Sequence, residues 1–198
     1  MSVIFAMCLY SFSMSITPGP VNLITLTTGI NHGFKNALPF VSGASIGFAL
    51  LLYCVGLGFN QMFNEYSFLM EIFGICGSIF ICYIGYKIAI STPEIQISKT
   101  EYPTFLHGFV LQWLNPKAWI ASIAGISAFN LADSSNQLIM FVSIYFAICY
   151  LSISTWAFMG TKISALLYKP KHLRIFNIMM GLSLIGVSLY LMFSQIEV

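Results

Sequence analysis

Charged residues are scarce in this sequence. Of its 198 residues only 7% are Asp, Glu, Lys or Arg, whereas 58% are hydrophobic. A soluble domain has about a quarter of its residues charged, so the few charges here cannot cover a folded surface in water. This scarcity excludes a soluble cytosolic enzyme, an acidic disordered region and a nucleic-acid binder, which would need clustered Lys and Arg. We therefore expect an integral membrane protein whose surroundings are the lipid bilayer.

Neither the cysteines nor the histidines have the spacing that is typical of a redox or metal site. No two of the five cysteines have CxxC spacing, and all of them fall within hydrophobic stretches. Buried cysteine commonly packs as a small hydrophobic residue. No His-rich loop is present, and the spacing of the histidines predicts no metal site. We expect neither a metal nor a cofactor.

Long stretches without charge predict the membrane spans. Four of them exceed the roughly 20 residues that a helix needs to cross a bilayer; they are residues 1–34, 36–64, 134–161 and 175–196. Two more candidates are interrupted by charge: 67–88 contains Glu71 near one end and Lys87 at the other, and 105–129 contains Lys117 in its middle. The sequence thus predicts six helices, near 3–25, 37–59, 67–88, 105–129, 137–160 and 175–195.

The remaining charges predict the orientation of these helices. The first, third and fifth connections contain seven cations, namely Lys35, Lys87, Lys99, Lys162, Lys169, Lys171 and Arg174. The second and fourth contain Glu65 and Asp133 but no Lys or Arg. Because basic connections stay in the cytoplasm, both termini are expected outside it. The N-terminal run has no basic region before Lys35, which argues against a cleaved signal peptide.

A polar segment at about 92–103 divides the chain near its midpoint. We expect it to be a cytoplasmic linker between two halves, about 1–91 and about 104–198, of a single transporter domain. Each half would contain three helices. Since three is an odd number, the halves would have opposite orientations in the membrane, which is the inverted-repeat arrangement of many transporters.

The leading helix of each half contains a helix-breaking motif. Thr17-Pro18-Gly19-Pro20 lies inside the first span and Asn115-Pro116-Lys117 inside the fourth. Proline removes an amide donor and clashes with the preceding turn, so neither span can be one unbroken helix. Asn115-Pro116 and Thr17-Pro18 each resemble an N-cap followed by a first helical residue. Breaks in matching positions point to a transporter's substrate site, and the alternative is a pair of ordinary proline kinks.

Lys117 is the most informative charge in the chain. An ionisable residue inside a span is by default a functional-site hypothesis. A cation in the first turn of a helix opposes the helix dipole, so local stability does not explain it. Half-helix N-termini suit a carboxylate ligand, whereas the alternative is that Lys117 extends to an interface. The candidate substrate-binding residues are Thr17, Pro18, Gly19, Pro20, Asn22, Asn115, Pro116 and Lys117.

These motifs resemble the lysine-exporter superfamily, and more narrowly its homoserine/threonine-exporter branch. The N-terminal resemblance is carried by Thr17–Pro20, Gly29, His32–Lys35, Gly43 and Gly47. Further along the chain it is carried by Gly77–Tyr83, Gly85, Lys87, Phe105, Gly108 and Asn115–Ala118. The Thr-Pro-Gly-Pro-x-Asn run and the Asn-His-Gly-Phe-Lys segment lean toward the cysteine/O-acetylserine-exporter-like members.

The resemblance implies an exporter of amino acids or their derivatives in the bacterial inner membrane, driven by the proton gradient. It also implies six helices in two repeats, with the Pro-Gly-Pro and Asn-Pro-Lys segments at the translocation site. The expected partners are a small amino acid, protons and lipid. Small residues at spacing four, such as Gly43 and Gly47, are also compatible with a homodimer.

Three other classes of membrane protein were weighed against an exporter. A membrane-embedded enzyme would need a nucleophile and base or a metal triad, and the spans contain no such constellation. An accessory or signalling subunit would have no need of two helix breaks, which cost stability. A channel without amino-acid transport would conduct ions in the absence of substrate counterflow.

Overall fold

All regular structure in the described part of the chain is helical, which confirms the all-α prediction. The computed structural model describes residues 3–59, 67–90, 102–131, 134–166 and 170–196. The elements are α1 Val3–Ile16, α2 Pro20–His32, α3 Phe34–Cys54, the π-helical turn η1 Val55–Phe59, α5 Ser67–Ile90, α6 Phe105–Trp113, α7 Pro116–Ala128, α8 Ser135–Leu166 and α9 Pro170–Ile196. Most of the predicted linker, 92–103, lies outside the described residues.

Both predicted helix breaks are present. α1 ends at Ile16 and α2 begins at Pro20, with a bend of 62° between them. In the second half α6 ends at Trp113 and α7 begins at Pro116. The predicted Thr17-Pro18 cap is wrong, because the N-cap of α2 is Gly19 in an extended conformation. The physical reason is Pro20, which disfavours helical geometry in the residue before it and so delays the start of the helix.

The ends of several helices differ from the predicted spans. α2 continues to His32, and α8 runs to Leu166 although the predicted span ends near residue 160. Polar residues near a membrane surface can continue a helix, because a fall in hydropathy indicates the edge of the bilayer and not the end of the helix. Gly33, with φ 82, terminates α2 and lets the chain turn directly into α3.

Two described helices are long and apolar enough to cross a membrane, and α1 with α2 makes a third if the bent pair counts as one span. The two are Phe34–Gly58 and Ser135–Ile163. Shorter apolar helices cover Ser78–Ile90 and Arg174–Gly186. The arrangement of six spans in two inverted repeats therefore stays a prediction.

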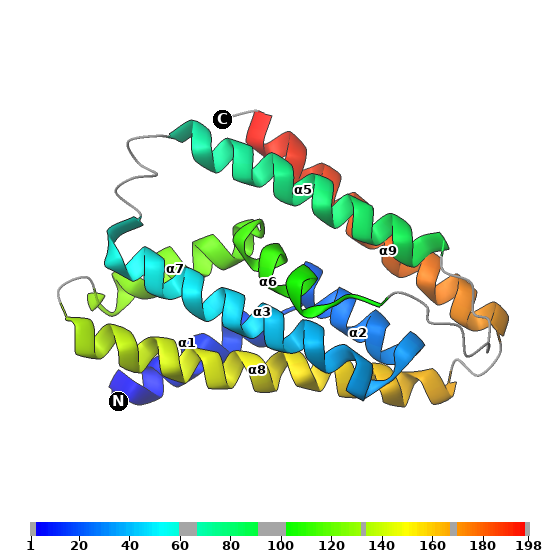
Figure 1. Cartoon of the computed structure of the whole chain (residues 1–198), viewed down its shortest axis with the longest axis horizontal. Coiled ribbons are helices and arrows are strands. Elements are labelled where there is room, and N and C mark those ends of the chain that lie inside the picture. The colour runs from blue at the N-terminus through cyan, green and yellow to red at the C-terminus, as the bar shows by residue number, and fades with distance from the viewer. Residues whose placement is uncertain (1–2, 60–66, 91–101, 132–133, 167–169, 197–198) are drawn as a thin grey trace.

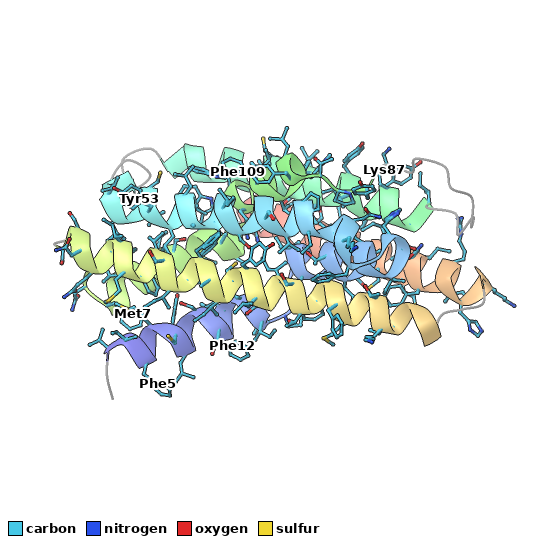
Figure 2. All side chains as sticks on the ribbon, turned by 60° about the horizontal axis from the view of Figure 1, so that its bottom comes forward. Phe5, Met7, Phe12, Tyr53, Lys87 and Phe109 are labelled. Carbon is cyan, nitrogen blue, oxygen red and sulfur yellow. The ribbon has the colours of Figure 1, made fainter. Side chains whose placement is uncertain are left out.

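The outer surface of the bundle is apolar, as lipid surroundings require. Phe5 and Phe12 on α1 point away from the bundle and are each 51% exposed, whereas Met7 points inward and is buried (Figure 2). Polar residues such as Thr25 and Ser122 are fully or almost fully buried. Large apolar side chains therefore cover the outside of the bundle, while its core contains polar residues among a majority of apolar ones.

Glycines bring three pairs of helices into backbone contact. A Cβ atom added to Gly29 would overlap the carbonyl of Ala157, so α2 lies directly on α8. A Cβ on Gly43 would likewise overlap the carbonyl of Phe105, where α3 meets α6. α5 and α9 run side by side along one edge of the molecule (Figure 1) and touch at Gly85. The small residues that suggested a dimer therefore pack within this chain.

Candidate functional site

Lys117 joins the two helix breaks. Its Nζ donates to the carbonyl oxygen of Thr17 at 2.8 Å and to the hydroxyl of Thr17 at 2.7 Å. The lysine stem also lies against Gly19, where an added Cβ would be 3.4 Å from the lysine Cδ. The ammonium group of Lys117 is thus held at the break between α1 and α2. The two motifs, a hundred residues apart, form one site.

The carbonyl groups at the end of α1 are satisfied by side chains. Asn22 Nδ2 donates to the carbonyls of Ser15 at 2.9 Å and Thr17 at 2.8 Å. Trp156 Nε1, from α8, donates to the carbonyl of Ile16 at 3.2 Å. An unsatisfied backbone group in a membrane costs several kcal/mol, so these bonds allow the helix to stop there.

Asn22 therefore has a structural role that the sequence did not reveal. Both hydrogens of its amide are used within the chain, so the group that it can offer a ligand is its carbonyl oxygen. The first-turn amides of α2, from Val21 and Asn22, precede the first intrahelical bond, which runs from Leu23 N to Gly19 O. Such amides are available to an anion.

The start of α7 is capped by the predicted residue. Asn115 Oδ1 accepts from the backbone N–H of Lys117 at 3.2 Å, and the Asn115 carbonyl accepts from Ala118 N at 2.9 Å. Trp119 Nε1 donates to the carbonyl of Trp113 at 2.7 Å and so satisfies the end of α6. Because these first-turn amides are already engaged, α7 offers a ligand its helix dipole and the ammonium group of Lys117.

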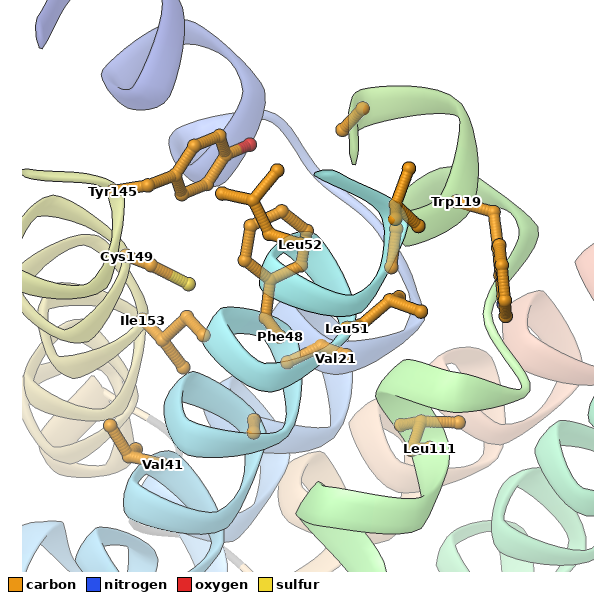
Figure 3. Packing of buried hydrophobic residues seen from close by; sticks show 14 of the residues in the cluster. Val21, Val41, Phe48, Leu51, Leu52, Leu111, Trp119, Tyr145, Cys149 and Ile153 are labelled. Carbon is orange, nitrogen blue, oxygen red and sulfur yellow. The ribbon is translucent and has the colours of Figure 1, made fainter. Parts of the chain in front are cut away.

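A cavity of about 410 Å³, counting its open mouth, lies where the broken helices meet α3 and α8. Asn22, Gln112, Asn115 and Lys117 are among the polar residues that line it. Another part is lined by Phe48, Tyr145, Cys149 and Ile153. Figure 3 shows Tyr145, Cys149 and Ile153 projecting from α8 toward Phe48 on α3.

Four of the eight predicted site residues line this cavity, namely Gly19, Asn22, Asn115 and Lys117. Thr17 reaches the site through its hydrogen bonds with Lys117. Pro18 is exposed, while Pro20 and Pro116 are the first residues of α2 and α7. The prolines therefore shape the backbone of the site.

Sequence reasoning missed the cavity residues on the unbroken helices. Tyr145, Cys149 and Ile153 follow one another at spacing four, so they share one face of α8. That spacing was visible in the sequence, but it is common in any packed helix. Cys149, which the sequence analysis treated as a packing residue, is buried and also lines the cavity.

Lys117 binds only neutral oxygen atoms within the described part of the chain. None of the described residues that line the cavity is acidic. A cation that is partly withdrawn from water is stabilised best by an opposite charge. The site is therefore suited to a ligand that brings its own carboxylate.

Residues 12–195 match the sequence family described as "LysE type translocator". The chain belongs to this family. This LysE-type translocator is accordingly a transport protein of the membrane, not the membrane-embedded enzyme that was one of the alternatives. No solved structure matches the chain.

Curated relatives of this translocator are named "Cysteine/O-acetylserine efflux protein". The chain is 27% identical to those of Escherichia coli O1:K1 / APEC and of Salmonella typhimurium, over 126 residues. This match covers 63% of this chain and 64% of each relative. The Klebsiella pneumoniae relative is 29% identical over 131 residues, which is 66% of either chain.

Proposed function

We propose that this LysE-type translocator is a secondary transporter that exports a small amino acid or a close derivative from the bacterial cytoplasm. The observation that carries the proposal is the position of Lys117, whose ammonium group reaches from α7 to Thr17 beside the cavity between the broken helices. The names of the relatives favour a small neutral amino acid with a heteroatom on its β-carbon, as in cysteine and O-acetylserine.

The ends of the broken helices match the two charges of an amino acid. The substrate carboxylate would bind Lys117 and the free first-turn amides of α2, at the positive end of the helix dipole. The α-ammonium group would bind the Asn22 carbonyl oxygen and the negative C-terminal end of α1. Discontinuous helices bind zwitterionic substrates in this way in other transporter folds.

Binding would also release a contact between the two halves. In this structure the ammonium group of Lys117 ties α7 to the α1–α2 break through Thr17. A substrate carboxylate competes for that ammonium group, because a charged acceptor is stronger than a neutral one. We propose that the two halves become free to move when the substrate carboxylate replaces Thr17 as the partner of the Lys117 ammonium group. We also propose that the proton gradient drives the transport cycle.

The proposed topology has six spans in two inverted repeats, with both termini outside the cytoplasm. The start of α3, the ends of α5 and α8 and the start of α9 lie at the same end of the molecule, at the right in Figure 1. These helix ends carry Lys35, Lys87, Lys162 and Arg174. The start of α1 lies at the opposite end, and α9 runs away from the basic end to finish at the top of the view. The positive-inside rule places the basic end in the cytoplasm.

Counterflow of radiolabelled amino acids in proteoliposomes tests the proposal. We expect saturable counterflow with the wild-type protein, its loss in Lys117→Met, and partial retention in Lys117→Arg, which keeps the charge. Unchanged transport by Lys117→Met would remove this residue from the mechanism. Absence of saturable flux across a broad amino-acid panel would refute the exporter, and an ion current without counterflow would indicate a channel.

A further inference from the structure

One wall of the cavity contains a hydroxyl group that has no hydrogen-bond partner among the described residues. Ser15, in the last turn of α1, lines the cavity and is only 9% exposed. Its Oγ is buried and forms no hydrogen bond with any described residue. Buried polar groups in folded proteins are nearly always paired, so an exception at a cavity wall points to a ligand.

The surroundings of this hydroxyl form a small and largely apolar compartment. Tyr145 and Cys149 line the same cavity as Ser15 and share one face of α8. The ring of Phe48 lies against Tyr145 with 4.4 Å between the ring centroids. Figure 3 shows these three side chains gathered between α8 and α3. A short side chain that enters this compartment would meet the Ser15 hydroxyl beside mainly apolar groups.

Ser15 lies close enough to the proposed carboxylate site for one small bound amino acid to reach both. Only Ile16 separates it from Thr17, whose oxygens bind Lys117, so the Cα atoms of Ser15 and Thr17 are at most about 7 Å apart. Asn22 holds the two positions together by donating to both carbonyls. A ligand whose carboxylate meets Lys117 can therefore bring a group on its β-carbon to the Ser15 hydroxyl.

The charges of the site limit what that side chain can be. No described residue lining the cavity is acidic, so a cationic side chain would have no counter-ion there and would meet Lys117. The apolar walls formed by Phe48 and Ile153 disfavour a second carboxylate in the same compartment. The site therefore favours a substrate with an uncharged side chain that carries one polar atom.

We propose that Ser15 is a specificity-determining residue. Its hydroxyl hydrogen-bonds the polar atom on the β-carbon of a small uncharged amino acid, while Phe48, Tyr145 and Cys149 enclose the rest of the side chain. This inference rests on the proposed function, because it assumes that the carboxylate is bound at Lys117.

L-Serine and L-alanine are suitable probes, since they differ by one hydroxyl group. The test measures kcat/KM of each in proteoliposomes for the wild type, Ser15→Ala and Ser45→Ala. Ser45 is the matched control, because its hydroxyl is also buried and unpaired among the described residues but does not line the cavity. We expect Ser15→Ala to lower the serine-to-alanine ratio about tenfold, the effect of one lost hydrogen bond. Alanine transport should stay within about twofold of the wild type, and Ser45→Ala should keep the ratio.

Equal losses for serine and alanine in Ser15→Ala would overturn the assignment, because they would indicate a structural role. An unchanged ratio would overturn it as well. Ser15→Cys, which restores a polar atom, should recover part of the ratio. If the wild type transports neither these two amino acids nor any other, the proposed function fails and the subsite fails with it. Loss of transport in Lys117→Met together with an unchanged ratio in Ser15→Ala would overturn the subsite alone.

Discussion

Replacement of Gly29 by alanine should separate two helices that support the site. Gly29 on α2 faces the backbone of α8, where an added Cβ would overlap the carbonyl oxygen of Ala157. The opposing Gly160 meets the carbonyl of Leu26 in the same way. Backbone atoms cannot turn aside as a flexible side chain can, so the whole of α2 must shift away from α8.

The size of the effect follows from the overlap that the added methyl group would create. Overpacking a well-packed interface costs about 1–3 kcal/mol. For a chain of this length, 1 kcal/mol shifts Tm by about 2–4 °C, so Gly29→Ala should unfold roughly 2–12 °C below a glycine-to-alanine variant that has no such overlap. The matched control is Gly186→Ala on α9, since a Cβ there has nothing within 4 Å. Alanine is also a better helix former than glycine by about 1 kcal/mol.

Thermal unfolding of the purified protein in one detergent measures both variants. We expect Gly29→Ala to unfold at a lower temperature than the wild type, and Gly186→Ala to unfold at the same or a higher temperature. Equal Tm values for Gly29→Ala and the wild type would refute direct backbone contact between α2 and α8. A similar loss in both variants would show that Tm responds to any added methyl group and not to this interface.

Three further predictions concern the site and the topology. Thr17→Val removes one acceptor from Lys117, so substrate should compete more easily and KM in counterflow should fall; an unchanged or higher KM would contradict the proposed exchange. Asn22→Ala leaves the Ser15 carbonyl without its donor and the Thr17 carbonyl with Lys117 alone, which should destabilise the protein by about 1–3 kcal/mol, seen as a lower Tm; a Tm equal to that of the wild type would argue against this capping role. The C-terminus is expected outside the cytoplasm, so a reporter that functions only there should be active when it is fused after Val198. Activity of a reporter that functions only in the cytoplasm would contradict the proposed topology.

The prolines explain why the helix breaks could be predicted and their details could not. Pro20 and Pro116 block helical hydrogen bonding wherever they occur, so the interruptions follow from the chain itself. The start of α2 was misplaced because two prolines in one motif each offered a possible first residue. Which of them the helix uses depends on Gly19 and on the donors that satisfy the end of α1, including Trp156 from a distant helix.

The sequence also indicated which polar residues to consider, but not how they are used. Asn115 was predicted as a cap and is one, because capping is a local interaction. Asn22 was predicted to bind substrate, and its amide hydrogens bind the carbonyls of residues seven and five positions before it. Ser15 gave no signal at all, since serine is tolerated anywhere in a packed membrane helix.

The scarcity of charge and the placement of proline determined the membrane class, the helical fold and the two interruptions, because each acts through solvent or through the local backbone. Only the tertiary structure decided that Lys117 meets Thr17, and that Ser15, Tyr145 and Cys149 share a cavity with them. A periodic pattern shows which residues share a face of one helix. It does not show which helix that face meets, because the pairing depends on close backbone contacts such as Gly29 against Ala157, made between residues far apart in the chain.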